Sequence, residues 1–111
     1  MPAFENGDAL LRALSALANP HRLRILAALT PGRTYVSELA RRLQMNRPLL
    51  YMHLQKLEAA GLVTGELVTA PDGSSVKYVE AVPFALVLDL DAITLAVQDL
   101  PGSPPATEEE K

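Results

Sequence analysis

Apolar residues near the start of the chain recur at the three- and four-residue spacing of an amphipathic helix. Residues 8–18 form one such segment, with Asp8 as the expected N-cap. Residues 20–29 form a second, because Asn19 suits a cap and Pro20 suits a first helical turn. The apolar stripes are expected at Leu10, Leu11, Leu14, Leu17 and Ala18 in the first helix and at Leu23, Leu26 and Ala27, flanked by Ile25, in the second.

Two further helical segments follow, separated by only about three residues. After an extended piece at residues 34–36, a helix of about two turns is expected to begin at Ser37 and to end near Gln44. Asn46 is expected to cap the next helix, with Pro48 in its first turn and Gly61 as its left-handed C-terminal residue. The buried face of that helix is expected at Leu50, Leu54 and Leu57. The spacing predicts a helix-turn-helix.

Beyond residue 61 the apolar period changes from about 3.6 to about 2, which is typical of strands. Strands are expected at residues 62–70 and 76–80, joined by a turn at residues 71–75 that contains Asp72-Gly73. Pro83 breaks any ladder, so residues 84–88 are expected to be extended. A last helix follows Asp89 or Asp91, with its apolar stripe at Leu90, Ile93, Val97 and Leu100.

The expected fold class is mainly α with a β-hairpin wing, a winged helix-turn-helix in the order α-α-α-α-β-β-α. Residues 8–100 form the single domain of this prediction. Residues 1–7 are expected to be a flexible N-terminus. Residues 101–111 are rich in Pro and Glu and have nothing to bury, so they are expected to be a disordered tail.

Composition restricts the chemistry open to this chain of 111 residues. It has no cysteine, which excludes disulfides, thiol nucleophiles and cysteine-based metal sites. It has no glycine-rich phosphate loop and no recognisable Ser, His and Asp motif, so we expect no enzyme. The longest apolar run, residues 81–88, is too short to cross a bilayer, and the first residues lack a basic signal-peptide region. We expect a soluble cytoplasmic protein without a cofactor.

The net charge of −3 conceals a segregation of charge along the chain. Residues 12–56 hold eight basic residues against Glu38 alone, whereas residues 57–107 hold Lys77 against seven acids. Such asymmetry indicates one basic working surface on an otherwise acidic body. The alternative is that the arginines are scattered, solvated charges on helix faces.

The run Tyr-Met-His-Leu-Gln-Lys-Leu-Glu-Ala-Ala-Gly-Leu-Val at residues 51–63 resembles the end of the recognition helix in bacterial winged-helix repressors of the arsenic-repressor (ArsR) type. Residues 19–26 are similar to the opening of that family's second helix, and residues 37–40 to its third helix. The resemblance covers residues 9 to about 100. It implies a transcriptional regulator, a probable repressor in the family's manner, that binds a pseudo-palindromic DNA operator with its fourth helix in the major groove.

The resemblance also implies a homodimer in which the first and last helices pack together. Their apolar stripes are wider than one hairpin and two short helices can cover, which favours self-association. The alternative is that both stripes close the core of a monomer. The dimer residues implied are Leu10, Leu14, Leu17, Ile93, Val97 and Leu100.

The helical period places one face of the fourth helix opposite its leucines. The base-facing residues expected there are Arg47, Pro48, Tyr51, Met52 and Gln55, and the phosphate-facing residues are Ser37, Arg41, Arg42, Lys56 and Lys77. Gln55 can pair with adenine, and Arg47 at the helix start also reaches the backbone. Positions that commonly hold arginine and small hydroxyl residues in the family hold Met52, Tyr51 and Leu50, so the family's usual recognition mode does not transfer.

The two histidines, His21 and His53, fall in different helices and lack the i, i+4 spacing of a metal pair. Each is expected to be an ordinary, partly buried helical residue, and Asp89 and Asp91 are explained as helix caps. Metal sensing is the inducer mode best known for the family. Here we expect an organic ligand, a partner protein or no inducer, and no metal.

A second class of function stays open, a winged helix that binds a protein instead of specific DNA. The acidic second half and the Pro-rich tail favour this alternative, and the cluster of Arg41, Arg42 and Arg47 favours DNA.

Overall fold

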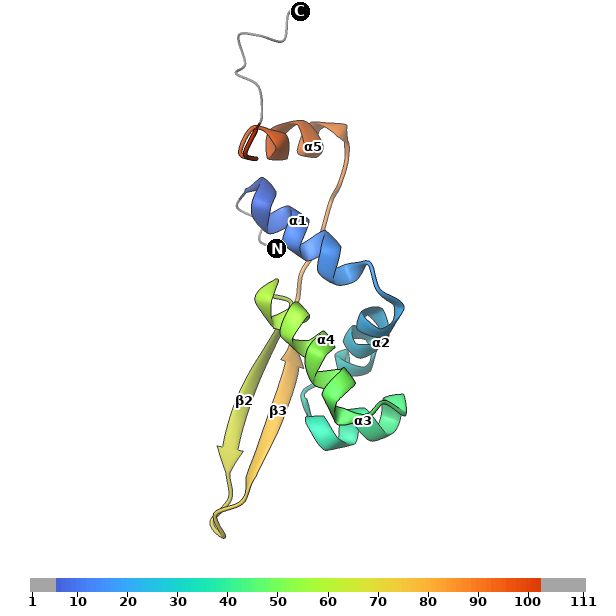
Figure 1. Ribbon diagram of the computed structural model, residues 1–111, viewed down its shortest axis with the longest axis vertical. Helices are drawn as coiled ribbons and strands as arrows, with labels where there is room; N and C mark the ends of the chain where they lie inside the picture. The colour runs from blue at the N-terminus through green and yellow to red at the C-terminus, as the bar shows by residue number, and fades with distance from the viewer. Residues whose placement is uncertain (1–5, 103–111) are drawn as a thin grey trace, which may run out of the picture.

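The computed structural model describes residues 6–102, which form five helices and three strands (Figure 1). In chain order these are α1 (Gly7–Leu17), α2 (Pro20–Leu29), β1 (Thr34–Tyr35), α3 (Val36–Leu43), α4 (Arg47–Ala59), β2 (Val63–Thr69), β3 (Ser75–Ala81) and α5 (Leu90–Val97). The predicted order of elements is confirmed. Most of the expected flexible N-terminus and of the expected tail, residues 1–5 and 103–111, lies outside the described residues.

Asparagine and aspartate side chains begin four of the helices. Asn19, Asn46 and Asp89 accept backbone N–H groups at the starts of α2, α4 and α5, as the sequence predicts. The expected cap of α1 was wrong, because Asn6 accepts from Ala9 N at 2.8 Å. Asp8 instead pairs with Arg12, one turn further along the exposed face of α1.

The three strands form one antiparallel sheet in the order β1-β3-β2. The β2–β3 hairpin is the predicted wing, with Val63 opposite Ala81 and Thr69 opposite Ser75. β2 is the outer strand of the hairpin. β3 is the central strand, and its other neighbour is β1, in which Thr34 lies opposite Val79. A two-residue strand is too short to show a period, so the sequence indicated an extended piece there and not its partner.

The core lies where α2, α3, α4 and the base of the wing meet. Its largest fully buried side chains are Ile25, Leu29, Leu39, Leu50, Leu54, Leu57, Leu62 and Val79. The predicted buried face of α4 is confirmed. The predicted stripe of α2 was wrong in part, since Ile25 and Leu29 are buried and Leu26 packs against the core, while Ala27 is exposed and Leu23 is 53% exposed. Alternative apolar faces of α2 differ by little in sequence, and packing against α3 and α4 selects one of them.

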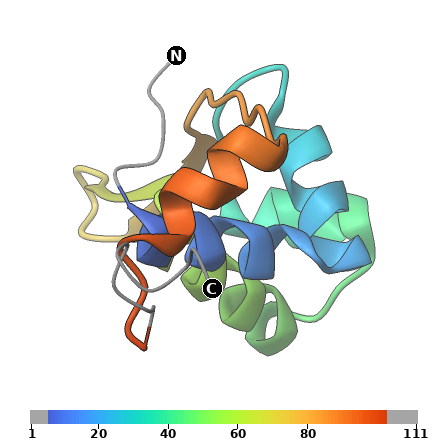
Figure 2. The ribbon, with the colours of Figure 1, turned by 90° about the horizontal axis from the view of Figure 1, so that it is seen from above.

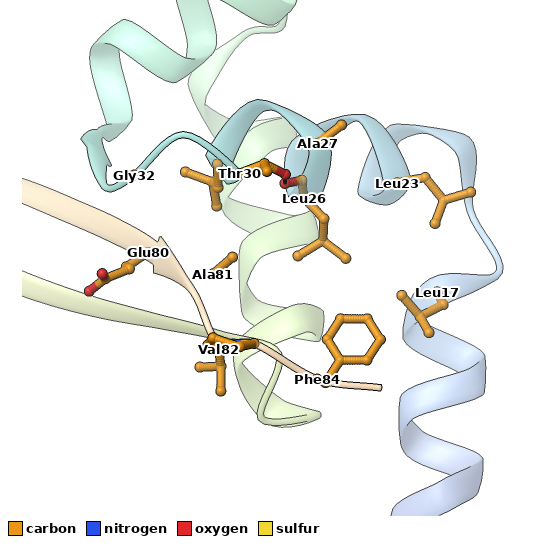
Figure 3. A pocket seen from close by; sticks show the side chains of 12 residues that line it. Leu17, Leu23, Leu26, Ala27, Thr30, Gly32, Glu80, Ala81, Val82 and Phe84 are labelled. Atoms are coloured by element: carbon orange, nitrogen blue, oxygen red, sulfur yellow. Dashed lines mark hydrogen bonds between the residues drawn. The ribbon is translucent and has the colours of Figure 1, made fainter. Parts of the chain in front are cut away.

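An apolar groove of about 610 Å³ lies between α2 and the extended segment after β3 (Figure 3). Leu17, Leu26 and Phe84 are half-buried and pack against the core beside it. Phe84 thereby fixes the start of the extended segment that the sequence predicted for residues 84–88. This segment carries the chain from the wing to α5.

Helix α5 stands apart from the core and packs against α1 (Figures 1 and 2). None of its residues is buried, although Leu90, Ile93, Leu95 and Val97 are apolar. Gly7 permits the close approach of the two helices, because a Cβ there would collide with the Ala96 carbonyl oxygen. α5 and the wing therefore lie at opposite ends of the molecule (Figure 1).

Candidate nucleic-acid interface

A tight turn joins α3 to α4. Gln44 adopts a left-handed conformation with φ 53° and ψ 47°, and Met45 N–H donates to the Ala40 carbonyl at 3.0 Å. Asn46 then caps α4 by accepting from Leu49 N–H at 2.9 Å. These bonds satisfy the backbone groups at the turn and fix the angle between the two helices.

The two faces of α4 differ completely in burial. Leu50, His53, Leu54 and Leu57 point into the core. All five residues expected to face bases are exposed on the opposite side, with Tyr51 39% and Met52 45% exposed; they are Arg47, Pro48, Tyr51, Met52 and Gln55. Large apolar side chains at that exposure offer contact surface to a partner.

Arg41 and Arg42 of α3, both expected to face phosphates, share one acidic partner. Arg41 and Arg42 both donate to the carboxylate of Glu38, Arg42 Nε at 2.8 Å from Glu38 Oε2. Hydrogen bonds from Arg41 and then Arg42 hold the pKa of Glu38 below its usual value, so the carboxylate stays charged. One acid therefore sits within the cluster expected to face phosphates.

The other phosphate-facing candidates differ in exposure. Ser37 is half-buried at the second position of α3, whereas Lys56 is exposed in the last turn of α4. Lys77 is half-buried and lies on β3 opposite Leu67, two residue pairs from the last pair of the wing.

Lys77 is held against α4. Its Nζ lies 3.7 Å from Glu58 Oε2 and 5.9 Å from the centre of the Tyr51 ring. Gly65 on β2 leaves room for this pair, because a Cβ there would lie 2.6 Å from Glu58 Oε2 and 2.7 Å from Lys77 Cε. Sequence reasoning missed Glu58 and Gly65, since their relation to Lys77 depends on how the wing packs on α4.

The wing itself carries acid and apolar surface. At its tip, the Asp72 carboxylate accepts from Ser74 N–H and Oγ, and these bonds lower the pKa of Asp72. Leu67 is the most exposed apolar residue of the two strands. On the sheet face away from α4, the Arg33 guanidinium lies 4.2 Å from the centre of the Tyr78 ring and pairs with Glu66.

The residues expected at a dimer interface lie on or just beyond α1 and α5. Leu10, Leu14, Leu17 and Leu100 are half-buried, and Ile93 and Val97 are about two-fifths exposed. Sequence reasoning did not include Leu95, which is 65% exposed on another side of α5.

The structure brings together the two histidines that the sequence treated as independent. The ring centres of His21 on α2 and His53 on α4 are 5.3 Å apart. Within residues 6–102 no three His, Cys, Asp or Glu side chains gather in a way that could hold a metal ion. No helix in the same range is long and apolar enough to cross a membrane.

A helix-turn-helix with a β-hairpin wing packed on its second helix defines a winged helix-turn-helix protein. Residues 17–66 match the family model of a helix-turn-helix domain. An HTH-type transcriptional regulator of Methanocaldococcus jannaschii is 40% identical over 79 residues, 70% of this chain and 81% of that protein. The HTH-type transcriptional repressor SmtB of Mycobacterium tuberculosis is 38% identical over 98 residues, 88% of this chain and 70% of SmtB.

Among solved structures, a homodimeric winged helix-turn-helix DNA-binding domain from Mycobacterium bovis, described as a possible ArsR-family regulator, superposes with a TM-score of 0.56. It is 32% identical to this chain, with 67% of this chain and 64% of that domain covered. The chain belongs to the ArsR family of winged helix-turn-helix transcriptional regulators.

Proposed function

We propose that this protein is a sequence-specific transcriptional regulator, acting as a repressor, that binds a pseudo-palindromic DNA operator as a homodimer. The observation that carries the proposal is the division of α4 into a fully buried face and an exposed face of Arg47, Pro48, Tyr51, Met52 and Gln55. A helix anchored in this way presents a fixed set of side chains to the major groove.

The exposed face of α4 offers both hydrogen-bonding and apolar side chains for contact with bases. Gln55 offers the bidentate amide that pairs with adenine, and Pro48 and Met52 offer apolar contact to a thymine methyl. Tyr51 lies near Lys77, with the ammonium 5.9 Å from the centre of its ring, so the two side chains are close enough to contact the same stretch of duplex. We assign backbone contacts to Arg41, Arg42, Lys56, Lys77 and Ser37, with Arg47 serving both groups.

The bare apolar surface of α5 supports the homodimer. An eight-residue helix with no buried residue has too little contact with its own chain to account for its apolar composition. Pairing α1 and α5 with the same helices of a second copy covers that surface and places two α4 helices for two half-sites. The Mycobacterium bovis domain, which is homodimeric, supports this assembly.

Family membership also supports the finer statements about cellular role. We assign the protein no catalytic activity, and we place its action in the cytoplasm, where a bacterial or archaeal regulator meets the chromosome. We assign the signal that releases DNA to a molecule other than a metal ion, because the sequence offers no thiolate and only two imidazoles.

Selection from a pool of random duplexes at moderate salt tests the proposal. Two half-sites with centres about one helical turn, roughly 34–36 Å, apart are expected to be enriched and then protected in footprints. If no sequence is enriched, the protein is not a specific regulator, and the winged helix is to be sought instead in complexes with other proteins.

A further inference from the structure

A buried imidazole lies on the core side of the recognition helix. The His53 side chain is only 3% exposed, and its Nδ1 accepts a hydrogen bond from Arg22 Nε at 3.1 Å. A ring nitrogen that accepts carries no proton, so the ring is neutral with its proton on Nε2. Within residues 6–102, Nε2 has no hydrogen-bond partner. Burying a hydrogen-bond donor without an acceptor destabilises the folded state, so packing alone does not explain a histidine at this position.

Arg22 connects this ring to a third helix. Its Nη1 donates to the Ser15 carbonyl of α1 at 3.4 Å while its Nε donates to His53 of α4. The guanidinium is planar, so the two bonds fix the directions of its acceptors relative to one another. One side chain of α2 thus links α1, the helix assigned to dimer contact, with α4, the helix assigned to DNA contact.

We propose that the Arg22–His53 hydrogen bond positions the recognition helix, and that DNA binding requires the neutral imidazole of His53. This inference rests on the proposed function. His53 follows Met52 directly and precedes Gln55 by two residues, so a shift of the ring displaces both of these base-facing side chains.

Protonation of the ring removes the acceptor. A proton on Nδ1 would point at Arg22 Nε–H and would place a second positive charge beside the guanidinium. Among residues 6–102, the charged or titratable groups that act on His53 are Arg22 and His21, both from α2, and no carboxylate is among them. Burial, Arg22 and His21, in that order, hold the pKa of His53 below its ordinary value. The ring therefore stays neutral near pH 7, and at lower pH protonation displaces it from the core.

The direction of the pH effect separates this mechanism from general electrostatics. Acid makes the net charge of a protein more positive, and added positive charge strengthens binding to DNA phosphates. Positioning by a neutral His53 predicts the opposite, a loss of affinity in acid.

The test measures affinity for the selected duplex between pH 8 and pH 5 in the full chain and three variants. His53→Asn keeps an acceptor near the position of Nδ1 but does not titrate, His53→Leu removes the acceptor, and His21→Asn is the matched control. Amide chemical shifts of α4 without DNA provide a second readout that does not depend on DNA binding.

The wild type and His21→Asn are expected to lose affinity with falling pH, by up to about tenfold per pH unit for each of the two His53 rings in the proposed dimer once these rings titrate. His53→Asn is expected to bind at pH 7.5 like the wild type and to lose this dependence, and His53→Leu to bind weakly although folded. Identical pH profiles for wild type and His53→Asn, or full affinity in His53→Leu, would overturn the inference.

If the wild type binds no duplex at pH 7.5, the proposed function fails, and the amide shifts alone decide the positioning role. Shifts in α4 that move with pH in the wild type but not in His53→Asn support it. Shifts that do not move, or that move equally in both, contradict it.

Discussion

Glu58 on α4 and Lys77 on β3 face each other across Gly65, with the ammonium 3.7 Å from the carboxylate. Both side chains are about 30% exposed, so water screens their attraction only in part. The pair fixes the wing against the recognition helix and holds the wing cation beside Tyr51. The position of Lys77 beside α4 thus depends on a glycine at residue 65.

Gly65→Ala is expected to break the contact between Glu58 and Lys77. The added methyl overlaps Glu58 Oε2 and Lys77 Cε, so one of these side chains must move. Both atoms lie near the ends of flexible side chains, so we expect the free energy of unfolding, measured by denaturant titration, to change by less than about 1 kcal/mol, while DNA binding weakens. Thr64→Ala, at the exposed neighbouring position of β2, is the control and should leave DNA binding unchanged. Wild-type DNA affinity in Gly65→Ala would show that the contact does not matter for binding.

Glu38→Gln is expected to strengthen binding to DNA of any sequence. The substitution removes the acid to which Arg41 and Arg42 both donate and frees their charge for phosphates. Affinity for the selected and a scrambled duplex, measured over a range of salt, should rise in parallel by a few-fold, with a steeper salt dependence. Asp8→Asn breaks a comparable acid–arginine pair on α1 and should leave affinity unchanged. A gain limited to the selected duplex would place Glu38 among the specificity residues instead.

Gln55→Ala is expected to change sequence preference, whereas Arg47→Ala is expected to lower affinity for all sequences. Loss of the amide should relax preference at one base pair at a cost of about 1–3 kcal/mol, while other positions keep theirs. Loss of the guanidinium should weaken binding to all sequences and reduce the salt dependence. Repeating the selection with each variant distinguishes the two. If substitutions at Tyr51, Met52 and Gln55 all leave the preferred sequence intact, α4 is not the element that reads bases.

Ile93→Glu is expected to produce monomers. The substitution places a charge on the apolar face of α5, and burying that charge in a dimer is unfavourable. Sedimentation at high micromolar concentration should show a dimer for the wild type and a monomer for the variant. Leu67→Glu introduces the same charge on the wing, far from α5, and should remain dimeric. A monomeric wild type would remove the basis for a palindromic operator.

The stability of the protein is expected to fall as pH decreases below about 6.5, the ordinary pKa of histidine. The folded state lowers the pKa of His53, so in this range the unfolded chain binds the proton more readily. The stabilisation is fully present above the unfolded pKa and is lost progressively as pH falls to the lowered folded pKa. Thermal unfolding of wild type and His53→Asn over this range measures the difference, and parallel curves would contradict the assignment.

Local chemistry explains which features could be predicted from the sequence. Asn19, Asn46 and Asp89 allowed the starts of three helices to be predicted, because an N-cap is adjacent in sequence to the helix that it begins. The leucines of α4 were placed correctly because a helix of 13 residues shows its period clearly. The DNA-facing side of α4 follows from that period, and its role in binding remains a prediction.

Features that depend on distant residues could not be predicted in the same way. The contact of Lys77 with Glu58 was not predicted because 19 positions of the chain separate the two residues. Arg22 and His53 were assigned no relation because 31 residues separate them. The face of α2 was misjudged because Ile25 and Leu23 are equally apolar, and only packing distinguishes them.

Among residues 6–102 of one chain, α5 packs mainly against α1, at Gly7. Whether α5 is folded should therefore depend on protein concentration. An isolated helix of eight residues is unstable in water, and α1 alone buries none of its side chains. In the proposed dimer, the folding free energy of α5 comes largely from contact with the second copy, which links the folding of α5 to protein concentration. Dilution should unfold α5 before the rest of the domain, so the abundance of the regulator would determine how much of it is able to pair on an operator.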